Sequence, residues 1–267
     1  MKQLRKHLRV YAHYFLQFWK SRLVYKTDFA LNSLSQMLNL GTSLLFLTLI
    51  FTQVETIRGW TFNQMLFLAG VGGVAMNVHH IFLFNVYNLG DEYVLTGDLD
   101  RYKLRPLNVL FQVYADQVRD ESLPKLITNL ALIAYAGSRI EAGILSAENV
   151  LYAVPALFSA VLVFGAVYLF FASLSFWTGR SKPIIWLVFR VSDFRRYPYS
   201  IYSKSIKILL VTLMPLAFAS FFPATFFLGK PGWDLWQLAS LAAGPFFYSL
   251  AYGFWRFGLS RYSSTGS

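Results

Sequence analysis

Six long apolar stretches, separated by short polar or charged segments, dominate this sequence. Only 14% of its residues are charged, whereas a soluble domain carries about 25%. A helix needs about 17–25 apolar residues to cross a bilayer, and no unpaired backbone group is tolerated there. We therefore expect an all-α integral membrane protein with six transmembrane helices, at residues 29–51, 62–89, 122–138, 150–177, 208–228 and 235–257.

The distribution of positive charge predicts how these spans are oriented. The chain has 24 Lys and Arg residues and a formal net charge of +11. If both termini are cytoplasmic, all of these residues except Arg58, Arg139 and Lys230 lie on the cytoplasmic side. Positive charge concentrates in the cytoplasmic loops of membrane proteins. The basic composition therefore indicates membrane orientation rather than nucleic-acid binding, and residues 179–207 are expected to form a basic cytoplasmic loop.

Residues 1–27 precede the six-span domain of residues 28–267 and have a pattern of their own. Basic residues fall on one side of a predicted helix there, and apolar residues recur at helical spacing on the other: Leu4, Leu8, Tyr11, Phe15 and Phe18. A basic helix with an aromatic face lies in the membrane interface. A targeting segment or a nucleic-acid-binding arm is the alternative, but the first span follows at once and favours an interfacial helix.

Two features stand out in the second predicted span. Ala69, Gly73 and Asn77 are spaced four apart, and such a small-residue stripe lets another helix approach closely, although small residues also recur there by chance. His79 and His80 follow. Adjacent residues on a helix point about 100° apart, so the two imidazoles do not easily share one metal ion. They are expected to be polar packing groups, with a proton-handling or ligand-binding role as the alternative.

The most highly charged loop lies between the second and third spans, at residues 90–111. A helix over residues 92–104 would place Leu95, Leu99 and Tyr102 near one face. Pro106 ends this helix, because the residue before a proline is pushed out of the α region. A charged helix between two spans is a place where a protein outside the membrane can bind. An ordinary solvated loop is the alternative.

The sequence contains no motif for catalysis or nucleotide binding. Without a GxxxxGK[ST] loop, the chain is not expected to hydrolyse ATP, and it also lacks HExxH and GxSxG motifs. No charged residue lies deep in a predicted span, although ion-coupled carriers usually need one. We expect the membrane half of a two-part transporter, with no cofactor of its own. The alternative is a motor-independent protein, either an ion-coupled carrier or a membrane-embedded enzyme or scaffold.

Several stretches of the chain are similar to one known family. GDLDRYKLRPLN at residues 97–108 is close to the motif Gly-x-Leu-Asp-x-x-Leu-x-Arg-Pro-Leu-Asn, with one extra residue between Asp100 and Leu104. Supporting matches are RYP at residues 196–198, LMPLAF at 213–218 and RYSSTG at 261–266. On these residues the chain resembles an ABC-2-type permease, the six-span membrane subunit of a bacterial ATP-binding-cassette exporter.

The resemblance implies partners and a coupling site. Two permease chains, identical or related, would pair in the bacterial cytoplasmic membrane with two ATPase subunits that bind ATP and Mg. Residues 1–27 would be the interfacial elbow, and the loop after the second span would be a cytoplasmic coupling helix seated in a groove of the ATPase. Leu99 and Leu104 would be its apolar anchors, and Arg101 and Arg105 would pair with acidic groups. The implied coupling residues are Leu99, Asp100, Arg101, Leu104, Arg105 and Pro106.

Overall fold

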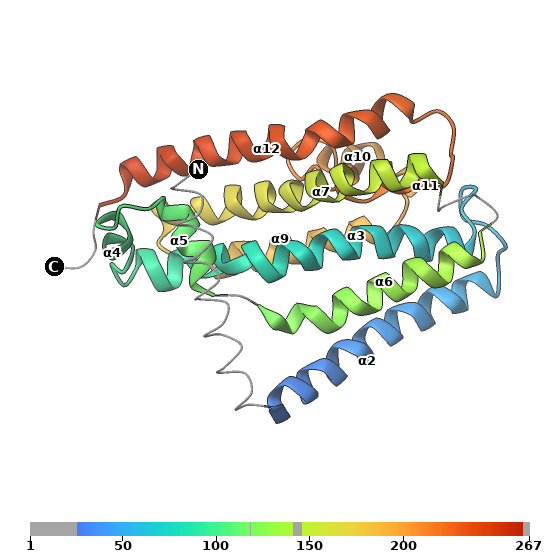
Figure 1. Cartoon of the computed structure of the whole chain (residues 1–267), viewed down its shortest axis with the longest axis horizontal. Coiled ribbons are helices and arrows are strands. Elements are labelled where there is room, and N and C mark those ends of the chain that lie inside the picture. Colours follow the sequence, from blue (N-terminus) through green and yellow to red (C-terminus); the bar gives the residue numbers. More distant parts are fainter. Residues whose placement is uncertain (1–25, 118, 141–145, 264–267) are drawn as a thin grey trace.

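The structure is a computed structural model that describes residues 26–117, 119–140 and 146–263. Every regular element within these residues is helical, which confirms the all-α prediction for the described chain. Residues 1–25, most of the predicted interfacial helix, lie outside the described residues. Long helices lie alongside one another and set the length of the molecule (Figure 1): α2 (Lys26–Phe51), α3 (Phe62–Leu83), α6 (Leu123–Ser138), α7 (Ala147–Ser173) and α12 (Asp234–Arg261).

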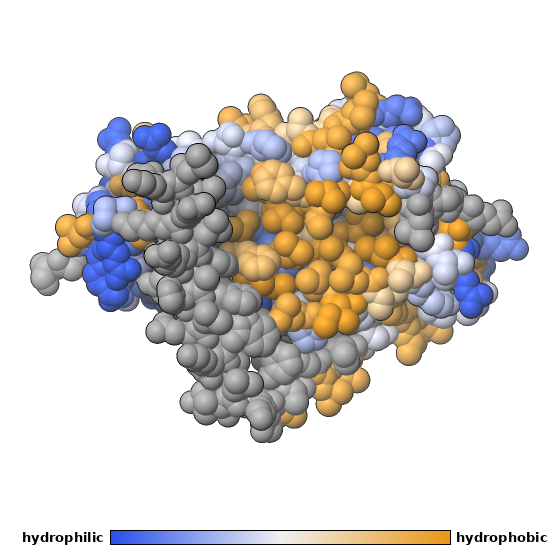
Figure 2. Space-filling view, viewed as in Figure 1, coloured by the Kyte–Doolittle hydropathy of each residue, from blue (hydrophilic) through white to orange (hydrophobic). Residues whose placement is uncertain are grey.

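The bundle has two ends, called here the α4 end and the Trp60 end. At the Trp60 end, the Nζ of Lys230 donates to the carbonyl oxygen of Gly59 at 3.0 Å and lies 4.6 Å from the centroid of the Trp60 ring. Hydrophobic side chains cover the middle of the molecule in Figure 2, between two more polar ends. The α4 end carries η1 (Phe84–Asn88), η2 (Leu89–Val94), α4 (Leu99–Lys103), α5 (Val109–Asp116) and α8 (Ser175–Thr178); η3 (Asp120–Ser122) leads into α6.

α7 and α12 pack closely along most of their length. Gly244 lies so near the backbone of Ser159 that a Cβ at Gly244 would overlap it. The Ser159 hydroxyl donates to the carbonyl of Ser240 and accepts the N–H of Gly244 at 2.8 Å. The Tyr152 hydroxyl donates to the carbonyl of Gln237 at 2.9 Å. Close approach at small residues and interhelical hydrogen bonds hold helices together where lipid offers no hydrophobic driving force.

Capping residues fix where two of the long helices begin. The Thr61 hydroxyl accepts the N–H of Gln64 at 3.4 Å, and the Gln64 side chain accepts the N–H of Thr61 at 3.3 Å. This reciprocal pair is a capping box, which satisfies two N–H groups at the start of α3. The Ser146 hydroxyl accepts the N–H of Asn149 at 3.2 Å at the start of α7. Both helices therefore begin close to the predicted starts of their spans.

The prediction that residues 179–207 stay at one end of the molecule is wrong. Ser181 contacts Gly90 at the α4 end, whereas the ring centroid of Tyr199 lies 6.0 Å from that of Trp233 near the Trp60 end. The segment therefore runs along the length of the bundle. Between residues 179 and 203 it forms three short helices, α9 (Lys182–Val191), η4 (Ser192–Arg196) and η5 (Tyr199–Ile201).

An apolar face on α9 explains this placement. Ile185 and Val188, three residues apart on the helix, are buried, and α9 packs against α7. Trp186 and Leu187 on the other side are exposed. Seven apolar residues are too few to suggest a span by themselves. Because α9 buries apolar residues against neighbouring helices, however, the chain enters the interior of the bundle instead of staying at its end.

The prediction of a single helical span over residues 208–228 is also wrong. The N–H of Ala217 donates to the carbonyl of Leu210 at 3.1 Å, so the chain reverses direction between these residues. Pro215 lies at the reversal and has no N–H with which to continue a helix. Pro223 is the third residue of α11, where an N–H has no intrahelical partner in any case. The segment is a helical hairpin made of α10 (Lys204–Leu209), η6 (Leu216–Ala219) and α11 (Phe221–Phe227).

Two helical runs among the described residues are long and apolar enough to cross a membrane, judged by length and composition. They are Phe62–Val94, which joins α3 to η1 and η2, and Ala147–Thr178, which joins α7 to α8. Leu216–Phe227 is apolar but shorter. The other predicted spans do not meet this criterion, so six transmembrane helices remain a prediction.

Candidate functional site

The coupling loop predicted from the sequence forms a small exposed projection at the α4 end (Figure 1). Leu104, just after α4, is 87% exposed, the highest value among the large hydrophobic side chains of the described residues. Arg101, Arg105 and Pro106 around it are also exposed, and Asp100 is half-buried. Arg101 forms an ion pair with Asp98 at the surface, with the two charged groups 3.2 Å apart. The structure therefore gathers a large apolar side chain and several exposed cations, Lys103 among them, on a single exposed turn.

Two details of this loop differ from the prediction. The helix covers only residues 99–103 and not 92–104, because Gly97 adopts φ +76°, a left-handed conformation that ends the preceding helical run. Leu99 is fully buried. It therefore holds α4 against the body of the protein and is not accessible to a partner, whereas Leu104 is.

Polar side chains fasten α4 and α5 to the bundle. The Nε2 of Gln112 donates to the carbonyl of Tyr102 at 2.9 Å. The Tyr93 hydroxyl donates to the carboxylate of Asp116 at 2.6 Å and accepts from the Nδ2 of Asn85 at 2.8 Å. Buried polar groups that are paired in this way rigidify a structure, because breaking one leaves an unsatisfied group. These hydrogen bonds thus hold the exposed turn rigidly against the bundle.

The same loop is joined to the start of α9. Gly90 donates its N–H to the hydroxyl of Ser181 at 2.9 Å, and the backbone N–H groups of Ser181 and Lys182 donate to the carboxylate of Asp91 at 3.1 and 3.0 Å. Asp91 therefore caps α9 from a distant part of the sequence. The Nζ of Lys182 also pairs with Glu92 at 2.9 Å. These contacts connect the loop that carries α4 to the helix that enters the bundle.

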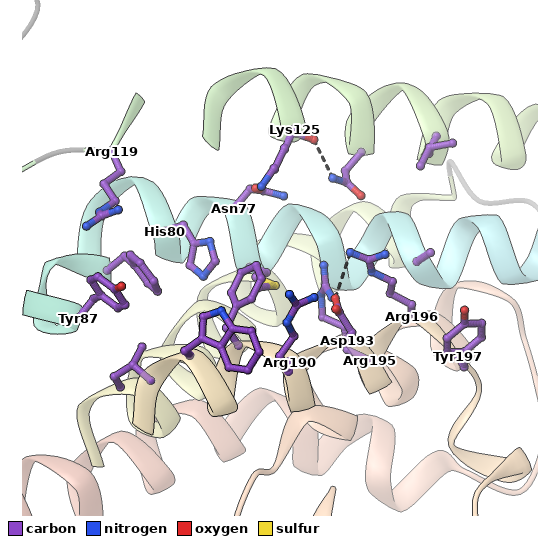
Figure 3. Close-up of a pocket in the computed structure, with 18 of the residues that line it drawn as sticks. Asn77, His80, Tyr87, Arg119, Lys125, Arg190, Asp193, Arg195, Arg196 and Tyr197 are labelled. Carbon is purple, nitrogen blue, oxygen red and sulfur yellow. Dashed lines mark hydrogen bonds and ion pairs between the residues drawn. The ribbon is translucent and has the colours of Figure 1, made fainter. Parts of the chain in front are cut away.

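A cavity of about 500 Å³ lies farther along α9, between α9–η4 on one side and α2, α3 and α6 on the other. The described residues that line it include one carboxylate, Asp193, and five cationic side chains. Figure 3 shows Arg119 and Lys125 on the α6 side of the cavity. The other cations, on the α9–η4 side, are Arg190, Arg195 and Arg196.

Arg195 is the most deeply placed of these cations. Its side chain is 7% exposed, and its Nε donates to the carbonyl of Gly72 at 3.3 Å. Its Nη1 donates to the carbonyl of Ser192 at 3.2 Å and lies 3.5 Å from the carboxylate of Asp193. The same carboxylate is 3.0 Å from Arg196. One carboxylate is therefore shared by two guanidinium groups.

The small-residue stripe lies beside this cavity. A Cβ at Gly73 would overlap the side chain of Asn129 in α6, and a Cβ at Gly70 would come within 2.7 Å of Ile133. The close approach of α6 thus falls at Gly70 and Gly73. Ala69 and Asn77, the other two members of the stripe, line the cavity, and the Nδ2 of Asn77 donates to the Gly73 carbonyl at 2.7 Å.

His79 and His80 are buried among aromatic rings. The His79 ring stacks on Tyr168 with centroids 4.9 Å apart, and the His80 ring lies 4.3 Å from that of Phe84. The Nε2 of His80, which lines the cavity, has no hydrogen-bond partner among the described residues. No group of three His, Cys, Asp or Glu side chains in the described part of the chain could hold a metal ion.

The sequence does not predict the cavity as long as residues 179–207 are assigned to one basic cytoplasmic loop. A signal was present: the apolar residues 183–189 lead directly to Arg195 and Arg196, and an aromatic stretch follows at residues 197–202. Charges flanked by apolar residues on both sides indicate a segment that is buried. What the sequence did not indicate is that Arg119 and Lys125 would meet them.

Comparison with known proteins identifies the family. Residues 37–266 match the model of a family described as ABC-2 family transporter protein. No curated protein and no solved structure matches the chain. The matched region includes the α4 loop, the stripe on α3 and every cation of the cavity. The chain therefore belongs to the ABC-2 family of transporter proteins, the membrane components that work with separate ABC ATPases.

Proposed function

We propose that this chain is the permease subunit of an ATP-driven exporter. It would pair with a second permease, identical or related, and with two ATPase subunits that bind ATP and Mg. The observation that carries this proposal is the exposed turn after α4, where Leu104 is 87% exposed on a support of buried hydrogen bonds. Leu104 lies at the polar end of the bundle, apart from its apolar middle, and binding of a partner there would bury it between the cations (Figure 2).

We assign the coupling roles to the exposed residues of this turn. Leu104 would fill an apolar groove of the ATPase, and Arg101 and Arg105 would pair with acidic groups at the rim of that groove. Pro106 would fix the chain direction beyond it. The half-buried Asp100 and the buried Leu99 would support the turn from beneath instead of contacting the motor.

The proposal includes a revised path through the bacterial cytoplasmic membrane. Six crossings would be made by α2, α3, α6, α7, the segment from α9 to η5, and α12. The hairpin of α10 and α11 would enter from the outer face and return to it. Both termini and the α4 end would then be cytoplasmic. This path is supported by α9 beginning beside Gly90 and by Tyr199 lying beside Trp233.

The contacts at the start of α9 offer a route from the motor to the membrane interior. ATP binding would close the motor and displace the α4 loop. Because Asp91 caps α9 and Gly90 is bonded to Ser181, the displaced loop would draw α9 with it. Movement of α9 would change the cavity that it lines. Inward-facing and outward-facing states would then be populated according to which nucleotide the motor holds.

Co-expression with the ATP-binding protein encoded in the neighbouring reading frame tests this function. We expect the two proteins to co-purify and to hydrolyse ATP. The double variant Arg101→Glu/Arg105→Glu should release the motor or uncouple its ATPase activity from transport. A matched control, Arg139→Glu/Lys204→Glu, reverses two exposed cations outside the α4 end and should leave the complex intact. Failure of any ATPase to associate, or equal effects of both double variants, would disprove the coupling role.

A further inference from the structure

Among the described residues that line the cavity beside α9, cations outnumber carboxylates. Arg119 and Lys125 reach it from the α6 side, and three arginines reach it from α9 and η4 (Figure 3). Asp193 is the only acidic residue among the described residues of the lining, and Arg195 and Arg196 share it. Arg195 is buried, Arg119, Lys125 and Arg196 are half-buried, and Arg190 is exposed at the edge of the cavity. A buried charge is costly unless it is paired. The lining is therefore suited to an anion.

The position of this charge argues against a simple orienting role. Arg195 bonds the carbonyl of Gly72, ten residues after the start of α3. At a rise of 1.5 Å per residue, that is about 15 Å along the helix, near its midpoint. Cations that orient a protein in a membrane lie beyond the helix ends. Arg180 lies between helices and is exposed in this way, whereas Arg195 is buried.

Two of the cations stack on aromatic rings, and stacking of this kind does not use the N–H groups of the guanidinium. The guanidinium of Arg119 lies 5.0 Å from the ring centroid of Phe84 and 5.4 Å from that of Tyr87. Its buried Nε has no hydrogen-bond partner among the described residues. The guanidinium of Arg190 lies 4.7 Å from the ring of Trp186. Stacking holds a guanidinium group in place but leaves its edge free for a planar acceptor such as phosphate or carboxylate.

We propose that this cavity binds the anionic group, phosphate or carboxylate, of an amphiphile. About 500 Å³ is within the range of small-molecule sites and suits a lipid-sized headgroup. The lining also contains apolar side chains, among them Leu44 and Leu47 from α2 and Leu132 from α6. An acyl or other apolar part would lie against these leucines. Binding of the amphiphile to the cavity does not require the ATPase. Only the further conclusion that the amphiphile is exported rests on the proposed function.

Binding of synthetic amphiphiles to the purified full-length chain in detergent micelles tests the proposal. The probes are dodecyl phosphate, dodecyl phosphocholine, whose choline cancels the phosphate charge, and inorganic phosphate. Each is titrated against bound radiolabelled phosphatidic acid. We expect dodecyl phosphate to displace the lipid at least ten-fold more effectively than either of the other two. Equal displacement by dodecyl phosphocholine would overturn the anion site, and equal displacement by inorganic phosphate would overturn the requirement for an apolar part.

Variants locate the binding in the cavity. Arg190→Gln/Arg196→Gln should weaken phosphatidic acid binding at least ten-fold, and Arg190→Lys/Arg196→Lys should recover part of it. Arg180→Gln/Lys204→Gln removes two exposed cations outside the cavity and should bind as wild type does. If the cavity variant is poorly folded, Lys125→Gln provides the same comparison from α6. Unchanged binding in the cavity variants would overturn the site. Association with the ATPase is measured in parallel, so that failure of this proposal is separable from failure of the coupling role.

Discussion

Gly90 donates its backbone N–H to the hydroxyl oxygen of Ser181 at 2.9 Å, across 91 residues of sequence. The same hydroxyl donates to the carbonyl of Tyr87 at 2.7 Å. Ser181, the residue that precedes α9, is thus hydrogen-bonded to the chain that leads into α4. The exposed turn at one end of the bundle and the cationic cavity within it are therefore joined by a short series of direct contacts.

Substitution of Gly90 by alanine should disrupt this junction. A Cβ at this position would overlap the backbone at Ser181, which cannot yield as a flexible side chain can. Overpacking of this kind costs about 1–3 kcal/mol. We expect Gly90→Ala to lower the thermal unfolding temperature of the purified protein. Gly41→Ala is the matched control, because nothing lies within 4 Å of its added Cβ. Equal unfolding temperatures for the two variants would refute the close contact.

The two leucines that flank α4 should respond in opposite ways to truncation. Leu99 is fully buried, so Leu99→Ala should destabilise the fold by about 2–5 kcal/mol. Leu104 is exposed, so Leu104→Ala should change stability by no more than about 0.5 kcal/mol. Affinity for the ATPase should fall in Leu104→Ala despite its normal stability. Thermal unfolding and co-purification, measured on the same preparations, separate the two effects; a Leu104→Ala protein that binds the ATPase normally would contradict the anchor role.

Asp91 should matter more for stability than its neighbour Glu92. The Asp91 carboxylate accepts two backbone N–H groups at the start of α9, at 3.1 and 3.0 Å. Loss of a helix cap costs about 1 kcal/mol. Glu92 forms a partly exposed ion pair with Lys182, and such a pair contributes about 0–1 kcal/mol. We therefore expect Asp91→Ala to unfold at a lower temperature than Glu92→Gln, and the reverse order would show that Asp91 is not a cap.

The sequence predicted the long helices because their apolar composition determines them directly. α3, α7 and α12 begin and run close to predicted spans, since an uninterrupted apolar stretch has few ways to satisfy its backbone other than a helix. Residues 208–228 are equally apolar, yet they form a hairpin. Whether a chain kinks or reverses at Pro215 depends on what packs around it, and composition does not contain that information.

The same difference between local sequence patterns and long-range packing applies to the functional residues. The exposed turn after α4 was predicted from charge and from a local motif, both of which lie within a dozen residues. The burial of Leu99 was not predicted, because it depends on the packing of α4 onto distant elements. The cavity depends on contacts such as that of Arg195 with Gly72, 123 residues apart. Without homologous sequences, no pattern in a single chain pairs such positions.

The contact between α7 and α12 provides the strictest test of the bundle. A Cβ at Gly244 would overlap the backbone of Ser159, so Gly244→Ala should separate the helices and break the hydrogen bond from Gly244 to the Ser159 hydroxyl. We expect a loss of about 1–3 kcal/mol or more, seen as a lower thermal unfolding temperature. Gly253, nine residues later in the same helix, has nothing within 4 Å of an added Cβ. Because alanine is a better helix former than glycine by about 0.5–1 kcal/mol, Gly253→Ala should be neutral or stabilising. The two identical substitutions in one helix should therefore change stability with opposite signs, and a shared sign would mean that α7 and α12 do not meet at Gly244.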